Sequence, residues 1–359
     1  MKWLALFLAI AWTCAAAEKI SVQRTGTEGD SPRWKLTITA SLPPQTITRI
    51  ATMGDVTVRG KRSGGIRYTI TQDVIAPDEA SVRQLARQYR VQAGSGQIGF
   101  FQPGALSVEI PRASPFLALS SNAGTIDAAD LDGSLLAGAN AGTIVLDRIG
   151  GNVEIHSNGG ATSLGSIGGS VRCYSGGGSI RAIKINGQAY FETEGGDIQV
   201  GEVLGAVTAL TGAGGIRIDR ARAGVLADTF GGLIEIGNAT SVQCRNAGGA
   251  IRLTNVSGSL SAATQRGSIV AEILAGRPLE DSVLSTGAGD ITVLIPSNMG
   301  VTIEAETSEM AASRPIVSDF SGLQIRARRS SVIATGNING GGPRLRLIGA
   351  GGRIEIRRK

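Results

Sequence analysis

The chain has 359 residues and a formal net charge of +6, with 52 glycines and only 4% aromatic residues. Its hydrophobic content of 42% is ordinary for a folded protein and excludes a disordered chain. The length allows one to three domains. We therefore expect a folded protein whose narrow core holds small and branched side chains.

Residues 1–17 predict a signal peptide. One positive charge at Lys2 precedes the apolar run Trp3–Trp12 and the small-residue cleavage site Ala15–Ala17. A lipid attachment at Cys14 is not favoured, because the three residues before it lack the pattern of a lipoprotein site. The apolar run is too short to cross a bilayer and no later segment is longer, so we expect no transmembrane segment after signal removal. The expected location is the periplasm, the outer surface or the extracellular space.

Residues 18–115 predict strands and one short helix. The alternating segments KLTITA, GDVTVRG and LSVEIP are typical of strands. The residues Val82, Leu85, Ala86 and Tyr89 follow helical spacing, and residues 77–79 (Pro-Asp-Glu) stand where the helix would begin. We expect this region to form the first rungs of a stack and a cap over its unpaired edge.

A nine-residue repeat dominates residues 116–291. Two successive repeats differ and together form a unit of 18 residues. The first carries two large aliphatic residues two positions apart, as in Ile198 and Val200, and the second carries an aliphatic and then a small residue, as in Val207 and Ala209. Alternation within each repeat predicts strands with one buried face, and the fixed period predicts stacked units. One residue is deleted before Val242, and Thr162 is the weakest match. The repeat falls on Ile126, Leu135, Ile144, Val153, Thr162, Val171, Ile180, Ala189, Ile198, Val207, Ile216, Val225, Ile234, Val242, Ile251, Leu260 and Ile269.

The predicted fold is all-β: a single-stranded parallel β-helix (β-solenoid) with about 18 residues per rung and one short helix near the N-terminal end. Glycines before each strand indicate corners whose backbone conformation is costly for a residue with a Cβ. No proline lies between Phe116 and Arg277, as expected where each strand pairs on both edges. Residues 292–359 regain prolines and predict the last rungs and a C-terminal cap.

The sequence resembles the family of exported bacterial "putative adhesin" proteins with β-strand repeats, a domain of unknown function. The resemblance rests on GDVTVRG, LSVEIPRASPFLALSSNAGTI, GDITVLIPSNMGVTIEAET and GGPRLRLIGAGGRIEI, and covers nearly the whole mature chain. It implies a parallel β-helix at the cell envelope and supplies no active-site residues.

Catalysis is not expected, and no catalytic or cofactor-binding residues are predicted. The outward positions of the repeats do not gather charges of one sign, and His156, the only histidine, should face solvent. A polysaccharide-active lyase or hydrolase is kept as an alternative; it requires a loop-walled groove with at least two carboxylates within about 10 Å. A self-assembling envelope scaffold is a second alternative.

Two ligand motifs are rejected. A calcium-binding β-roll needs an aspartate in successive turns, and only Asp197 occupies that place. The segment GSGQIG at 94–99 matches a dinucleotide fingerprint in letters, but follows a predicted helix and not a strand. We predict no metal and no cofactor.

Cys173 and Cys244 occupy equivalent inward positions four 18-residue units apart. Their separation along the axis should be roughly 19 Å, too far for a disulfide. We predict two reduced, buried cysteines.

Two surface features remain. Outward positions form a candidate surface-binding patch of Glu154, His156, Arg172, Tyr174, Tyr190 and Glu192. The segment from Phe320 onward contains nine basic residues and only one acidic residue, Glu355. Such a basic segment would suit binding to lipopolysaccharide, nucleic acid or an acidic polymer, although a solvated strand face is favoured. We expect an adhesin-like or structural module whose partner is an envelope component, glycan or protein and not nucleic acid; the oligomeric state is left open.

Overall fold

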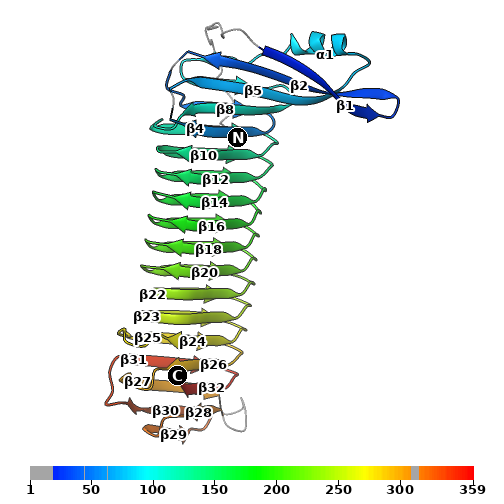
Figure 1. Cartoon of the computed structure of the whole chain (residues 1–359). Coiled ribbons are helices and arrows are strands. Elements are labelled where there is room, and N and C mark those ends of the chain that lie inside the picture. The colour runs from blue at the N-terminus through cyan, green and yellow to red at the C-terminus, as the bar shows by residue number, and fades with distance from the viewer. Residues whose placement is uncertain (1–18, 44, 63, 309–314) are drawn as a thin grey trace. The chain divides into compact units, whose positions relative to one another are not determined.

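A computed structural model describes residues 19–43, 45–62, 64–308 and 315–359. Within these residues the elements are strands apart from one helix, α1 (Glu79–Ala86) (Figure 1). None of the described residues form a helix long and apolar enough to span a membrane. The predicted signal peptide, with Cys14, lies outside the described residues. The chain divides into two compact units, Met1–Cys173 (unit 1) and Tyr174–Lys359 (unit 2).

The strands of unit 1 are β1 (Lys19–Glu28), β2 (Ser31–Leu42), β3 (Arg49–Thr52), β4 (Val56–Lys61), β5 (Ile66–Ile75), β6 (Gln92–Gly94), β7 (Gln97–Phe100), β8 (Ala105–Pro111), β9 (Phe116–Ser121), β10 (Ile126–Leu131), β11 (Ser134–Ala139), β12 (Ile144–Ile149), β13 (Val153–Ser157) and β14 (Thr162–Ile167). The next strand, β15 (Val171–Ser175), contains the boundary between the units.

The strands of unit 2 are β16 (Ile180–Ile185), β17 (Ala189–Thr193), β18 (Ile198–Val203), β19 (Val207–Thr211), β20 (Ile216–Ala221), β21 (Val225–Thr229), β22 (Ile234–Asn246), β23 (Ile251–Thr264), β24 (Ile269–Ile273), β25 (Ser282–Thr286), β26 (Ile291–Ile295), β27 (Val301–Ser308), β28 (Ile316–Ser318), β29 (Leu323–Ala327), β30 (Ser331–Ile338), β31 (Arg344–Gly349) and β32 (Ile354–Arg358).

The regular rungs of both units are parallel and in register. In unit 1, Ile126 lies opposite Ile144, a partner 18 residues later, and Ile144 lies opposite Thr162. In unit 2, Ile198 lies opposite Ile216, and strands β16, β18, β20, β22 and β23 follow one another along the stack (Figure 1). The parallel β-solenoid with about 18 residues per rung and one short helix is therefore confirmed.

The shortened repeat is also visible in the register of unit 2. Val225 of β21 pairs with Val242 of β22, 17 positions later, where Ser241 takes a positive φ of 61°. Burial alternates along regular strands such as β17, β19 and β21, and Phe191, Ile198 and Ile216 are at most 1% exposed. Identical slots thus form continuous interior columns, which is where most of the apolar surface is removed from water.

The corner glycines are explained by close packing and not mainly by positive φ, which corrects the expectation from sequence. Between residues 126 and 269, only Gly142 and Gly258 among the glycines have φ in the left-handed region. A Cβ added to Gly232 would instead lie 2.1 Å from the carbonyl oxygen of Gly214, one rung earlier. Stacked corners leave no room for a side chain at that point.

A column of buried hydroxyls on the inner side of the corners was not predicted. In unit 2, Thr211 Oγ1 donates to the Gly196 carbonyl at 2.9 Å and accepts from the Gly214 amide at 3.2 Å. Thr229 repeats the first bond with Gly214, again at 2.9 Å. Each hydroxyl satisfies backbone groups of two successive corners that burial would otherwise leave unpaired. Equivalent inner positions carry Thr52, Ser121, Ser157, Ser175, Thr193, Thr211, Thr229, Asn246, Thr264, Thr286 and Thr307.

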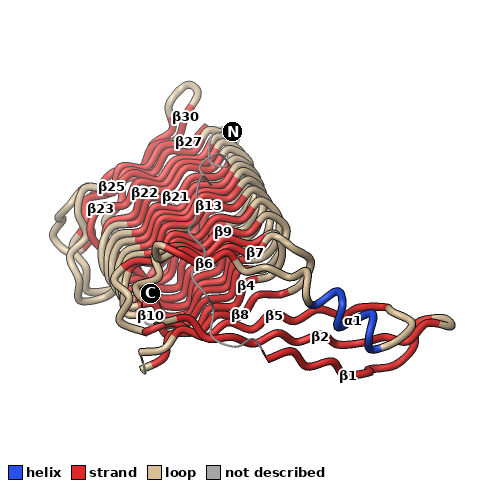
Figure 2. Tube along the Cα trace, turned by 90° about the horizontal axis from the view of Figure 1, so that it is seen from above, coloured by secondary structure: helices blue, strands red, loops and turns tan. Residues whose placement is uncertain are grey.

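The N-terminal strands of unit 1 do not follow chain order. β4 lies between β10 and β8, and β8 pairs on its other edge with the antiparallel strand β5. β2 and β1 extend this sheet with further antiparallel pairs. Helix α1, capped by Asp78, contacts β1 and β2 (Figure 2). Val82 and Ala86 of α1 are buried, as the helical spacing predicts.

The C-terminal strands of unit 2 also leave chain order. β32 inserts between β26 and β28, so that Ile354 pairs with both Ile291 and Ile316. β31 lies likewise between β25 and β27. β27 pairs on its remaining edge with β30, which is antiparallel, and β29 follows. The last residues of the chain are therefore an interior rung of this unit, not its outermost one.

Candidate surface-binding site

The first half of the predicted patch belongs to unit 1. Val153, Ile155 and Ser157 of β13 are buried, so Glu154 and His156 face outward, as the alternation predicts. Glu154 Oε1 and His156 Nε2 lie 2.9 Å apart, and both side chains are about half exposed. Arg172 is exposed on β15. The histidine therefore contacts a carboxylate at the surface.

The second half belongs to unit 2 and is an aromatic pair with a carboxylate. The ring centroids of Tyr174 and Tyr190 lie 5.4 Å apart with the planes inclined at 46°. Tyr190 Oη donates a hydrogen bond of 2.6 Å to Glu192 Oε2. This bond raises the pKa of the Tyr190 phenol to about 12, because it holds the proton against a negative charge. The cluster offers two aromatic faces beside a hydrogen-bond acceptor.

The six residues are thus three in each unit, and strand β15 carries both Arg172 and Tyr174. The structure groups Glu154 with His156, and Tyr174 with Tyr190 and Glu192. That all six form one patch stays a prediction.

The outer face of unit 2 continues beyond the tyrosines. Thr208 and Leu226 follow Tyr190 in register, and Leu210 and Asp228 follow Glu192. Leu226 is 38% exposed, which agrees with the alternation that also places Tyr190 outward. The sequence analysis did not include it in the candidate patch.

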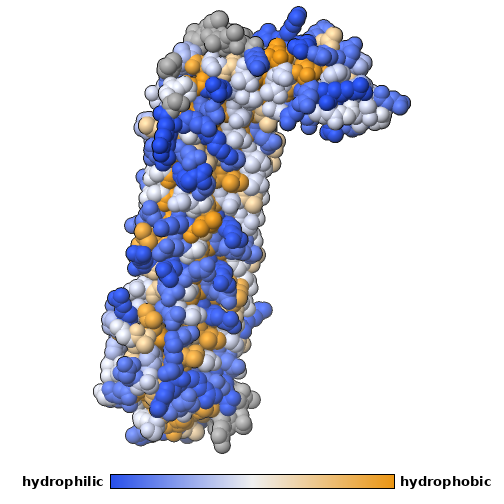
Figure 3. All heavy atoms as spheres, in the orientation of Figure 1, coloured by the Kyte–Doolittle hydropathy of each residue, from blue (hydrophilic) through white to orange (hydrophobic). Residues whose placement is uncertain are grey.

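Apolar groups are dispersed on the surface that Figure 3 shows, among hydrophilic ones. The largest exposed fraction among the large hydrophobic side chains of the described residues belongs to Phe230, at 73%. It stands beside the corner glycines 231–232, with Leu233 at 42% on the other side. Sequence alone gave no signal for this, because corner residues have no strand alternation.

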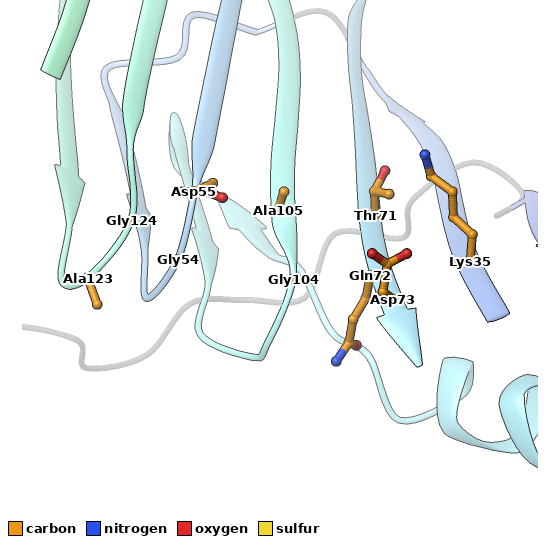
Figure 4. A pocket seen from close by; sticks show the side chains of 10 residues that line it. All are labelled: Lys35, Gly54, Asp55, Thr71, Gln72, Asp73, Gly104, Ala105, Ala123 and Gly124. Atoms are coloured by element: carbon orange, nitrogen blue, oxygen red, sulfur yellow. The ribbon is translucent and has the colours of Figure 1, made fainter. Parts of the chain in front are cut away.

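Unit 1 contains a shallow hollow of about 470 Å³ (Figure 4). Its polar lining includes Lys35, Asp55, Gln72 and Asp73, and its walls are strands and tight turns. Asp55 Oδ1 accepts a hydrogen bond of 2.7 Å from the Thr125 amide, so this carboxylate stabilises the local backbone. Two carboxylates, Asp55 and Asp73, line the hollow, as the enzyme alternative would require. The described residues around it are strands and tight turns and not the long loops that wall such active sites.

The dinucleotide-like segment forms a hairpin. β6 and β7 pair antiparallel with Ser95 and Gly96 at the turn, both with positive φ of 48° and 76°. A strand–turn–helix arrangement, which phosphate binding requires, is absent from this segment. Gly96 serves the turn, whereas Gly94 and Gly99 lie in the paired strands.

The cysteines are buried, as predicted. Cys173 and Cys244 are 0% and 1% exposed and form no disulfide. Burial raises the pKa of Cys173 to about 12 and also raises that of Cys244, so both thiols are protonated and unreactive at neutral pH. The described residues contain no cluster of three or more His, Cys, Asp or Glu side chains able to hold a metal ion.

Comparison with known proteins adds little. No family model and no curated protein matches the chain. A solved structure of a "putative cell adhesion protein" from Clostridium sporogenes ATCC 15579 is similar at 9% identity, covering 95% of this chain and 100% of that chain, with a TM-score of 0.18. The fold assignment rests on strand register and not on this likeness.

Proposed function

We propose that this protein is an exported, non-catalytic β-solenoid of the bacterial cell envelope that binds its partner as an adhesin-like surface module. The observation that carries the proposal is the cluster of Tyr174, Tyr190 and Glu192 on the outer face of unit 2. Adjacent aromatic rings supply apolar contact area at low entropic cost, which is why binding surfaces use them.

The support beneath the cluster is rigid. β17 carries Tyr190 and Glu192, and its inward residues Ala189, Phe191 and Thr193 are at most 3% exposed. The backbone amides of β17 are held in a parallel ladder with β19. A surface built on such strands is preorganised, so little ordering entropy is lost on binding.

The chemistry of the cluster suits a glycan. Sugar rings present C–H faces that pack against aromatic rings, and hydroxyl groups that donate to carboxylates. Glu192 accepts one bond from Tyr190 and has further acceptor capacity. The proposed ligand is therefore a neutral or basic glycan of the envelope or of a neighbouring cell surface.

Self-assembly by stacking of solenoid ends is less well supported. At the edges of the parallel stacks, β8 pairs with antiparallel β5 in unit 1, and β27 pairs with antiparallel β30 in unit 2. These antiparallel neighbours occupy the edges that a second parallel rung would need.

The test is a glycan array probed with the mature chain, followed by titration of any ligand found. We expect the double variant Y174A/Y190A to bind at least about tenfold more weakly, as for other aromatic anchors. The matched control T208A/S261A changes two outward residues of the same face and should bind normally. Unchanged binding by Y174A/Y190A, or cleavage of the glycan, contradicts the proposal. Cell fractionation tests export independently.

A further inference from the structure

Eight of the nine basic residues from Phe320 onward separate into two groups in the structure, and the ninth, Arg346, is exposed on β31. Four of them form ion pairs within unit 2: Arg344 with Asp281, Arg353 with Glu355, Arg357 with Asp319 and Glu355, and Lys359 with Glu272. A fifth, Arg358, lies over the Phe320 ring, 5.2 Å from its centroid. These five basic side chains contact their partners from within or beside β31 and β32, and so help to stabilise the inserted rung.

The hairpin of β29 and β30 holds a different set. Arg326 is on β29, and Arg328 and Arg329 lie at the turn, where the Arg328 amide donates to the Ser331 carbonyl at 2.7 Å. All three side chains are exposed, and none forms an ion pair with an acid of the described residues. Arg326 donates only to Gln324 Oε1, at 2.7 Å. These three guanidinium groups, which fall within four residues and form no ion pair with a described acid, make an exposed positive cluster in unit 2.

An exposed aliphatic side chain accompanies these charges. Ile325 is 48% exposed, although its register partner Ala334 on β30 is fully buried. β29 has one hydrogen-bonded neighbour, β30, among the described strands, so the hairpin is an edge of the unit. Guanidinium groups bind phosphate oxygens in a bidentate manner. Arg326 and Ile325 lie on opposite faces of β29, but both are exposed at this edge, so a surface that meets the edge can contact the arginine while the aliphatic side chain enters the acyl boundary.

We propose that the β29–β30 hairpin, through Arg326, Arg328, Arg329 and Ile325, docks unit 2 on the phosphate headgroups of an anionic lipid surface. Anionic lipids attract arginines near the surface, and each arginine strengthens binding by about fivefold at moderate salt. The isoleucine distinguishes a lipid surface from a soluble polyanion, which offers no apolar layer. The binding falls with rising ionic strength, because exposed charges are screened.

The experiment is sedimentation of the full mature chain with vesicles of phosphatidylcholine, with and without phosphatidylglycerol. We expect binding to the anionic vesicles only. The variant R326Q/R328Q/R329Q should bind roughly a hundredfold more weakly, and R326K/R328K/R329K should retain most of the binding. I325S should bind the vesicles more weakly while leaving binding to heparin unchanged.

The matched control is R217Q/R220Q/R222Q, which removes the same charge from unit 2 at positions that pair with Asp219, Glu202 and Glu235. It should bind anionic vesicles as the unchanged chain does. An equal loss in this control shows an unspecific charge effect and overturns the proposal. Equal affinity for heparin or DNA with no effect of I325S assigns the hairpin to soluble polyanions, and also overturns it.

Discussion

The regular rungs and the terminal strands of the units use similar residues but are specified differently. In β18 and β20, Ile198 and Ile216 pair at the repeat distance of 18 residues. In β26 and β32, Ile291 and Ile354 pair at a distance of 63 residues, after the chain has passed through β27, β28, β29 and β30. Regular rungs are therefore set by local periodicity, whereas the terminal rungs depend on a long-range return of the chain.

This difference has an energetic consequence. A regular rung adds to an edge that already exists, so each step closes a short loop. The inserted rung of β31 and β32 must close a much longer loop, but each of its two strands then pairs on both edges. Four of its side chains become completely buried: Leu345, Leu347, Ile354 and Ile356. We expect the terminal part of unit 2 to be stable only when this rung is present.

The largest predicted effect is that of deleting residues 344–359. Removal leaves β25, β26, β27 and β28 without a partner on one edge. Hydrogen exchange should show residues 301–308 and 316–338 losing protection, while residues 180–264 keep theirs. A synthetic peptide of residues 344–359 should restore protection. Continued protection of residues 301–308 and 316–338 in the deleted chain would show that the inserted rung does not hold this region.

A core substitution in a regular rung comes next. Phe191 is 0% exposed, and Phe191→Ala should lower the free energy of unfolding by about 3–5 kcal/mol, because it leaves a cavity. Phe230 is the matched control, because it is the same residue type but 73% exposed. Phe230→Ala should change the free energy of unfolding by at most about 0.5 kcal/mol. Urea unfolding measures both. Similar costs for the two variants would be incompatible with the inward and outward assignment.

The corner packing is tested by a pair of glycines. A Cβ at Gly232 would meet the Gly214 carbonyl at 2.1 Å, so Gly232→Ala should cost about 1–3 kcal/mol. A Cβ at Gly177 meets nothing within 4 Å, and Gly177→Ala should be neutral or slightly stabilising. If Gly232→Ala is tolerated equally well, the corners are not in close contact.

Loss of one corner hydroxyl should have a smaller effect. Thr229→Val keeps the shape of the side chain but removes the bond to the Gly214 carbonyl, at an expected cost of about 1–2 kcal/mol. Thr208→Val on the outer face is the control and should change the free energy of unfolding little. Equal values for the two threonines would mean that the inner hydroxyls do not contribute to stability.

The smallest predicted effect is confined to the outer face. The pKa of Tyr190 is raised to about 12 by its bond to Glu192, so this contact persists below the ordinary tyrosine pKa of about 10 and is lost as pH rises through about 12. Glu192→Gln should lower the pKa of Tyr190, measured by tyrosinate absorbance, and should lower the unfolding midpoint at neutral pH only slightly, because the pair is exposed. Tyr190→Phe identifies the transition. An unchanged titration would show that the two side chains do not interact in solution.

Much of the regular architecture could be predicted from the sequence because the repeat records it directly. The columns of Ile198 and Val207, the deletion before Val242 and the buried cysteines all follow from period and alternation. The inserted rung could not be predicted, because β31 and β32 continue the same strand pattern and nothing local states which edges they join. The role of Gly232 was misjudged for a related reason: a glycine needed for packing against the next rung looks the same in sequence as one needed for a turn.

The candidate site was predictable only in part. Alternation placed His156 and Tyr190 outward, but a side chain's partner depends on rotamers, and the bond from Tyr190 to Glu192 is not recorded by any spacing rule. Leu226 was left out of the candidate patch although alternation places it outward, and Phe230 stands at a corner, where alternation gives no signal. The arginines of the β29–β30 hairpin were visible as a basic sequence, but only the ion pairs of their neighbours showed which charges remain available.

Cysteine cross-linking on the outer face of unit 2 tests the central claim most directly, in a chain whose buried cysteines are replaced by alanine. Thr208 and Leu226 are register partners on adjacent rungs, about 4.8 Å apart, so T208C/L226C should form a disulfide under mild oxidation. Gln243 lies one rung further, so T208C/Q243C should stay reduced. The reverse outcome, or cross-linking in neither variant, would contradict the stacking of equivalent residues on successive rungs.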